Sequence, residues 1–180
     1  RHDPNALSKF LFTRGIWLVI LELTIVRFGW FFNLTYSFSV GQVIWAIGWS
    51  MVALSILSRL PVKAVAVIGI SIILLHNTLD VVKPESFGSF AWLWTILHKP
   101  GTVQLFPNVS IFYLYPVLPW IGVMCAGYAF GALYTLSQER RKSILLLLGV
   151  GMMLGFCILR ALNIYGDPSL WIAQPNIFFT

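Results

Sequence analysis

The chain has 180 residues, of which 58% are hydrophobic and 10% are charged, and its mean hydropathy is +0.84. Soluble domains carry about 25% charged residues, so this composition excludes an ordinary soluble protein and indicates a polytopic membrane protein. The net charge is +6, but the basic residues are too few and too scattered to form a phosphate-binding stripe, which excludes nucleic acid as a partner.

The hydrophobic residues gather into segments that are each close to the ~20 residues a spanning helix needs. We expect about five spanning helices, over Gly15–Asn33, Val40–Ser58, Pro61–Asp80, Tyr113–Leu136 and Ser143–Ile164. The predicted fold class is therefore all-α, a polytopic transmembrane helix bundle that forms a single domain over residues 1–180. Because the chain opens on Arg1 without a methionine or a signal peptide, we expect it to be part of a longer protein, with flanking helices on both sides.

Most basic residues fall on one side of the membrane if the five helices alternate in direction. They are Arg1, Lys9, Arg14, Arg59, Lys63, Arg140, Arg141 and Lys142. Because cytoplasmic loops are enriched in Lys and Arg, the N-terminus is expected in the cytoplasm and the C-terminus outside. The expected location is a bacterial plasma (inner) membrane.

The outer loop between the third and fourth helices, about 81–112, is long for a compact bundle. Within it, Ser89–His98 is too short and too polar at its flanks to cross the membrane. We therefore expect an interfacial or re-entrant helix there, with Trp92 and Trp94 in the headgroup zone, where tryptophan is enriched.

Two local patterns predict further structure. Val103–Tyr115 partly alternates and is rich in β-prone residues, and Pro107–Asn108 is expected to turn it. Gly127 and Gly131 are four apart on the fourth helix, as are Gly151/Gly155 on the fifth. Small residues at this spacing let helix backbones approach closely, so we expect these last two helices to pack together.

Polar side chains on different helices lie at a similar depth. At a rise of about 1.5 Å per residue from the basic end, His76 and Arg27 are roughly 20 Å deep, and Asp80 and Arg160 are roughly 26–27 Å deep. A bilayer core is about 30 Å thick, so these groups lie in its outer third, where they are costly unless they face a bundle interior or a cavity. His76 and Asp80 are four apart and would share one face of an α-helix. We therefore expect a polar cavity open to the outer side.

The expected site has two groups of residues. The catalytic group is His76 and Asp80, and the substrate-binding group is Arg27, Gln42, Asn77, Arg160, Asn163 and Asp167. Asp80 needs a positive partner to stay ionised at this depth, and Arg160 is the expected one. Structural alternatives stay open, since an arginine can snorkel outward, His76 can be a packing residue, and Asp80 with Arg160 can be a structural ion pair. His76 and Asp80 supply fewer ligands than a metal site needs, so no metal is expected.

Several strings recur in an order that is typical of one family. They are FLFTRGIWLVILELTIVRFGWFFNL, GQVIWAIGWSM, LLHNTLD, YPVLPWIGVMCAGYAFG and LRALNIYGDP. In that order they resemble the middle part of bacterial membrane proteins of the heparan-alpha-glucosaminide N-acetyltransferase-like type. These belong to a broader group of multi-helix membrane acyltransferases.

The resemblance implies acyl transfer across the membrane. An acyl-CoA on the cytoplasmic side would be the co-substrate, with no bound cofactor, and a sugar or glycan hydroxyl or amine on the outer side would be the acceptor. The family's usual early helix, with an Arg-Gly and a catalytic-type histidine, precedes the region that these strings cover, so His76 is not equated with that histidine. Acyl transfer needs a base and donors for the developing oxyanion, and the expected base is His76 oriented by Asp80, with Arg27 or Arg160 holding negative charge.

Other functions stay open beside the acyltransferase. One is a transporter or flippase, because transporter sites near the midplane also use charged residues inside the membrane. Others are a non-catalytic subunit of a larger membrane complex and an inactive fragment. The expected partners are the lipid bilayer, the acceptor, and either further copies of the chain or a larger complex. Broken helices or internal repeats would favour the transporter, and glycan acetylation in membranes would favour the enzyme.

Overall fold

The computed structural model describes residues 4–162 and divides into two compact units. Unit 1 covers Arg1–Ala132 and unit 2 covers Leu133–Thr180. Unit 1 carries most of the predicted site residues.

The described part of unit 1 is built from helices and three short strands. The α-helices are α1 (Pro4–Leu21), α2 (Arg27–Phe31), α3 (Val43–Leu57), α4 (Val62–Leu75), α5 (Ala91–Leu97) and α6 (Val117–Phe130). A π-helical segment, η1 (Glu22–Val26), joins α1 to α2. The 3₁₀ segments are η2 (His76–Val81), η3 (Pro84–Phe90) and η4 (Gly131–Thr135), of which η4 crosses the boundary between the units. The strands are β1 (Phe38–Gly41), β2 (Gly101–Phe106) and β3 (Val109–Tyr113).

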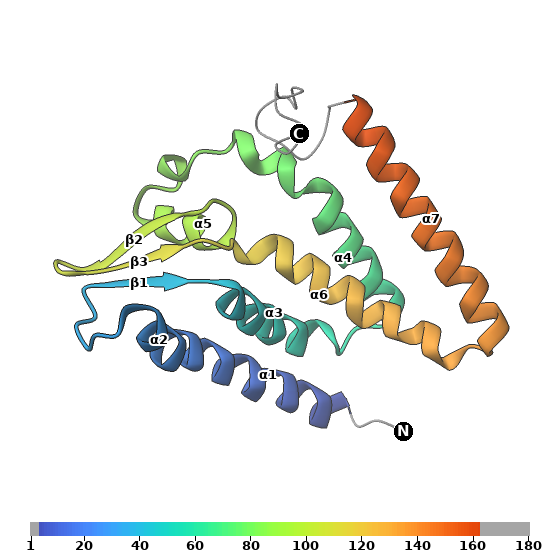
Figure 1. Cartoon of the computed structure of the whole chain (residues 1–180), viewed down its shortest axis with the longest axis horizontal. Helices are drawn as coiled ribbons and strands as arrows, with labels where there is room; N and C mark the ends of the chain where they lie inside the picture. Colours follow the sequence, from blue (N-terminus) through green and yellow to red (C-terminus); the bar gives the residue numbers. More distant parts are fainter. Residues whose placement is uncertain (1–3, 163–180) are drawn as a thin grey trace. The chain divides into compact units, whose positions relative to one another are not determined.

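Four helices of unit 1 lie side by side in a row, in the order α1, α3, α6, α4, so that α1 and α4 form its two edges (Figure 1). The strands lie where these helices begin or end on one side, which we call the strand end of the row. Glycines form the contacts between two of the neighbouring pairs. A Cβ added at Gly15 of α1 would lie 2.6 Å from the carbonyl oxygen of Gly48 on α3. A Cβ added at Gly69 of α4 would lie 2.9 Å from the carbonyl oxygen of Gly122 on α6. These helices therefore meet backbone to backbone, as small residues permit.

Two clusters of buried side chains fill the row. The cluster at the strand end contains Val19, Trp45, Val103, Ile111, Tyr113 and Val117. The other contains Leu11, Leu54, Val65 and Cys125. The ring of Tyr113 lies 5.0 Å from that of Trp45, and burial raises the pKa of the Tyr113 hydroxyl above its ordinary value, so the phenol stays neutral.

The strands form one sheet in the order β1-β3-β2, in which β1 is parallel and β2 antiparallel to β3. The predicted hairpin is present, and its turn falls at Pro107–Asn108. Strand β1 is a correction to the prediction, because Val40 and Gly41 belong to a strand and α3 begins only at Val43. Partners in β3 supply the hydrogen bonds that hold this segment extended.

Three helices in the described residues are long and apolar enough to cross a membrane: Val62–Val81, Val117–Thr135 and Gln138–Leu162. They match the third, fourth and fifth predicted spans, and the helical membrane fold class is confirmed. The first predicted span begins earlier, at Pro4, and passes through η1. The second corresponds to the shorter apolar helix α3. The predicted interfacial helix corresponds to α5, preceded by η3.

Unit 2 contains α7 (Gln138–Leu162), which begins with the charged sequence QERRK and continues into an apolar stretch. Its glycines, Gly151 and Gly155, were predicted to pack against Gly127 of α6. Gly127 belongs to unit 1 and both α7 glycines to unit 2, so that packing stays a prediction.

The glycine contact between α4 and α6 predicts a large effect from one methyl group. Gly69→Ala should lower the free energy of unfolding by about 1–3 kcal/mol, because the new Cβ would meet the backbone nitrogen of Ala126 at 2.7 Å. Gly29→Ala on α2 is the matched control, since a Cβ there meets nothing within 4 Å. Chemical denaturation in detergent gives the free energy of unfolding of both variants. Equal stability of the two variants would contradict close packing at Gly69.

The strand end of the row is predicted to face the outer side of the membrane, and the opposite end is predicted to face the cytoplasm. Arg59 and Ser55 both contact Ser8, so the end of α3 lies beside the start of α1, at the end opposite the hairpin (Figure 1). In a background with Cys125→Ser and Cys157→Ser, Asn108→Cys should react with an impermeant thiol reagent added outside. Leu60→Cys should react only after permeabilisation. The reverse pattern would invert the predicted orientation.

Candidate functional site

The 3₁₀ segment η2, which follows α4, is tied to the end of α5 by an Asp80–His98 pair. His98 Nε2 lies 2.9 Å from Asp80 Oδ1. The imidazole is 2% exposed, whereas the Asp80 side chain is 60% exposed. Lys99 Nζ also donates to the Asp80 carbonyl oxygen at 3.1 Å. Two adjacent residues after α5 thus hold one residue of η2, which fixes this segment against the helix.

The pair also fixes the tautomer of His98. A carboxylate oxygen accepts hydrogen bonds, so Nε2 carries the proton that points at Asp80 and, in the neutral ring, Nδ1 is an acceptor. His98 Nδ1 is buried and has no hydrogen-bond partner among the described residues. His98 was not among the predicted site residues. Its partner is 18 positions away on another element, so no spacing pattern reveals the pair.

Aromatic packing supports His98 from one side. Trp94 stacks on Phe87 with ring centroids 4.8 Å apart, and its ring also lies 5.0 Å from that of His98. Its Nε1 donates to the Val82 carbonyl oxygen at 3.1 Å. Trp94 is therefore half-buried whereas Trp92 is exposed, and the place of both in the headgroup zone stays a prediction.

His76 begins η2, where the α-helix gives way to a 3₁₀ helix. A 3₁₀ helix has three residues per turn, so residues four apart do not share a face. The prediction that His76 and Asp80 share an α-helical face is therefore wrong, and Asp80 contacts His98 instead. The signal was present in the sequence, because Asn77, Thr78 and Asp80 all have low helix propensity.

The His76 ring is nevertheless held beside His98. His76 Nδ1 lies 3.2 and 3.0 Å from the carbonyl oxygens of Ile72 and Ile73. Carbonyl oxygens accept hydrogen bonds, so Nδ1 carries the proton and Nε2 is the acceptor of the neutral ring. The two imidazoles are 6.5 Å apart between centroids and nearly perpendicular. Asn77, a predicted binding residue, follows His76 directly and is half-buried.

Arg27 performs a different task at the other edge of the row. It is 3% exposed, and its guanidinium lies 4.3 Å from the centroid of the Tyr36 ring. The guanidinium donates hydrogen bonds to the connection between α2 and β1, where the acceptors are Ser39 Oγ, Asn33 Oδ1 and the carbonyl oxygens of Asn33, Thr35 and Phe38. Among the described residues, Arg27 and His76 have no hydrogen-bond partner in common. Arg27 therefore holds this connection in place rather than facing His76.

Glu22 and Gln42 form a second contact in the same region. Glu22 Oε1 accepts a hydrogen bond from the backbone N–H of Gln42 at 3.2 Å. Gln42 directly precedes α3, so the carboxylate lies at the positive end of that helix, where negative charge is stabilised. Gln42 contributes its backbone N–H to this contact, and substrate binding by its side chain stays a prediction.

The remaining predicted residues belong to unit 2. Arg160 lies on α7 in unit 2, so its pairing with Asp80 stays a prediction. Asn163 and Asp167 lie outside the described residues. Within residues 4–162, no three His, Cys, Asp or Glu side chains come together as a metal site requires.

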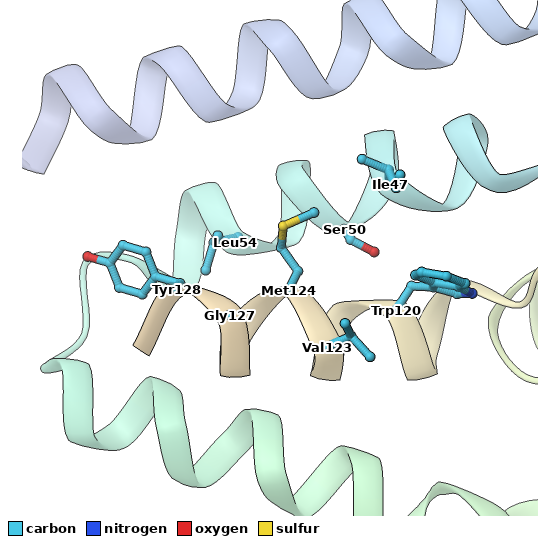
Figure 2. Close-up of a pocket in the computed structure, with 8 residues that line it drawn as sticks. All are labelled: Ile47, Ser50, Leu54, Trp120, Val123, Met124, Gly127 and Tyr128. Atoms are coloured by element: carbon cyan, nitrogen blue, oxygen red, sulfur yellow. The ribbon is translucent and has the colours of Figure 1, made fainter. Parts of the chain in front are cut away.

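A pocket of about 370 Å³ lies between α3 and α6. Figure 2 shows its lining, which is apolar apart from Ser50 and the polar tips of Trp120 and Tyr128; the other lining residues are Ile47, Leu54, Val123, Met124 and Gly127. None of the predicted site residues lines this pocket. The candidate site is therefore the His76, Asn77, Asp80 and His98 group at the end of α4.

The Asp80–His98 pair predicts a coupling that a double-mutant cycle can measure. Asp80→Ala should lower the free energy of unfolding by about 1–3 kcal/mol, because it leaves the buried His98 Nε2 without a partner. In a His98→Phe background, Asp80→Ala should cost much less. Glu85→Ala, which removes an exposed carboxylate from η3, is the control and should have little effect. Additive effects of the Asp80 and His98 changes would show that the pair contributes nothing.

Comparison with known proteins finds one family whose sequence pattern matches this chain. The family described as heparan-alpha-glucosaminide N-acetyltransferase, catalytic, matches residues 2–172. No curated protein and no solved structure matched the chain. The family match covers nearly all of the sequence, including α4, η2 and α5, and it agrees with the resemblance carried by the sequence strings. The chain therefore belongs to the heparan-alpha-glucosaminide N-acetyltransferase catalytic family of membrane proteins.

Proposed function

We propose that this protein transfers an acyl group from a cytoplasmic acyl-CoA to a sugar or glycan on the outer side of the membrane. The family supports a membrane acetyltransferase-like function. The observation that carries the proposal is the fixed tautomer of His76, whose Nδ1 is bound to two backbone carbonyl oxygens. This arrangement presents Nε2 as a proton acceptor, which a general base requires.

In the proposed reaction, His76 Nε2 accepts the proton of an acceptor hydroxyl or amine as that group attacks the thioester carbonyl. The new C–O or C–N bond forms, the C–S bond breaks, and the proton passes to the departing thiolate to give free CoA. Asn77 offers an amide that can hold the acceptor or the developing oxyanion. The Asp80–His98 pair is assigned a positioning role, because it fixes η2 and thereby the His76 ring.

The π-helical segment η1 does not give the transporter alternative the support that an unwound helix would give. That alternative would be favoured by helices that unwind inside the membrane. The π-helical segment η1 interrupts the first helix, but the residues at both its ends keep right-handed helical backbone angles. The helix changes its hydrogen-bond register there without unwinding.

The proposal predicts that His76→Ala abolishes most acyl transfer. With the protein in proteoliposomes, labelled acetyl-CoA and glucosamine as a simple acceptor, the rate should fall by about 10²–10⁴-fold, the usual contribution of a general base. Glu85→Gln, on an exposed carboxylate of η3, is the control and should retain the wild-type rate. Thermal unfolding of each variant separates loss of activity from loss of fold.

Two results would contradict this proposal at different levels. A wild-type rate in His76→Ala would remove His76 from the chemistry while leaving acyl transfer intact. Absence of transfer by the wild-type protein, with a range of acyl-CoA donors and amino-sugar or hydroxyl acceptors, would overturn the acyltransferase function itself.

A further inference from the structure

Unit 2 carries a strong local charge that the proposed reaction does not use. Three consecutive cations, Arg140, Arg141 and Lys142, follow Glu139 at the start of α7. Among the described residues, none of the three forms an ion pair with a carboxylate. Unpaired cations of this kind are an attractive site for a negatively charged ligand.

One of these cations is held in a defined place. The Arg141 guanidinium carbon lies 5.3 Å from the centroid of the Tyr134 ring. The Arg141 backbone N–H also donates to the Ser137 carbonyl oxygen at 2.9 Å. The Arg141 guanidinium forms no ion pair with a carboxylate among the described residues, so its N–H groups can donate to a phosphate.

Arg141 and Lys142 line a hollow of about 380 Å³ together with Gln138, Leu145 and Leu146. Its lining is polar and cationic at the start of α7 and aliphatic about one turn, roughly 5 Å, further along the helix. Leu146 is 60% exposed and the following Leu147 is 74% exposed. The helix Gln138–Leu162 is long and apolar enough to span a membrane, so its leucines are suited to bilayer depth.

We propose that this hollow binds an anionic phospholipid. The phosphate group lies against Arg141 and Lys142, and the beginning of an acyl chain lies along Leu145 and Leu146. The order of the lining, cations first and leucines next along a spanning helix, matches the order of headgroup and chain in a phospholipid. A soluble phosphate compound would satisfy the cations but would gain nothing from the exposed leucines, which favours the lipid.

Native mass spectrometry of the purified protein in a neutral detergent tests the site by titration with phosphatidylglycerol. The wild-type chain should bind phosphatidylglycerol in preference to phosphatidylcholine. Arg141→Gln with Lys142→Gln should weaken binding about 30-fold, since each basic residue near an anionic lipid surface contributes about fivefold. Lys9→Gln with Lys63→Gln is the matched control, because it removes the same charge from exposed positions outside the hollow.

The aliphatic part of the hollow has its own variant. Leu146→Ser keeps every charge but should also weaken phosphatidylglycerol binding, because the acyl chain loses apolar contact. This variant keeps the proposal testable if the double substitution at Arg141 and Lys142 fails to fold. Thermal unfolding of each variant in the same detergent identifies such a failure.

Four results would overturn the proposal. Equal weakening in both double variants would indicate a general charge effect, and unchanged binding in Arg141→Gln with Lys142→Gln would place the lipid elsewhere. Equal binding of phosphatidylcholine would remove the requirement for an anionic headgroup. Displacement of phosphatidylglycerol by added CoA would assign the hollow to a soluble phosphate compound instead.

Discussion

The close approach of helix backbones at Gly69 and Gly122 is the constraint on which the candidate site depends. In a bilayer the surrounding lipid is as apolar as leucine, so helices associate through contact and not through the hydrophobic effect. The glycines bring α4 against α6, and the 3₁₀ segment η2 continues directly from α4. The position of His76 is therefore set by the packing of Gly69, about two turns earlier on α4, against Gly122 of α6.

Buried polar groups then complete the strand end of the row. Each would be costly without a partner, and each has at least one hydrogen-bond partner nearby, although Glu22 Oε2 and His98 Nδ1 have none among the described residues. Arg27 is held by carbonyl oxygens of the α2–β1 connection, Glu22 by the start of α3, and His98 by Asp80. The matched depth of Arg27 and His76 reflects this shared end of the row. It does not require a shared cavity, because their contacts belong to opposite edges.

Hydrophobicity was sufficient to predict the helical membrane fold and three of the spanning helices, and β-propensity was sufficient for the hairpin. Strand β1 could not be predicted, because Phe38–Gly41 runs into an apolar segment and becomes a strand only through pairing with β3. His98 was missed because its role depends on η2 and α5 packing together. The 3₁₀ segment could have been found, since Asn77 and Thr78 are poor helix formers.

The parallel pairing of β1 with β3 has a consequence for the order of assembly. Ser110 donates to the Ser37 carbonyl oxygen across 73 positions of sequence. During synthesis, α1 and α3 can pair early, because their contact at Gly15 and Gly48 is closer in sequence. Strand β1 must then wait, unpaired, until α4, α5 and the hairpin have been made. Contacts of such long range form late, so the sheet closes as one of the last steps of folding.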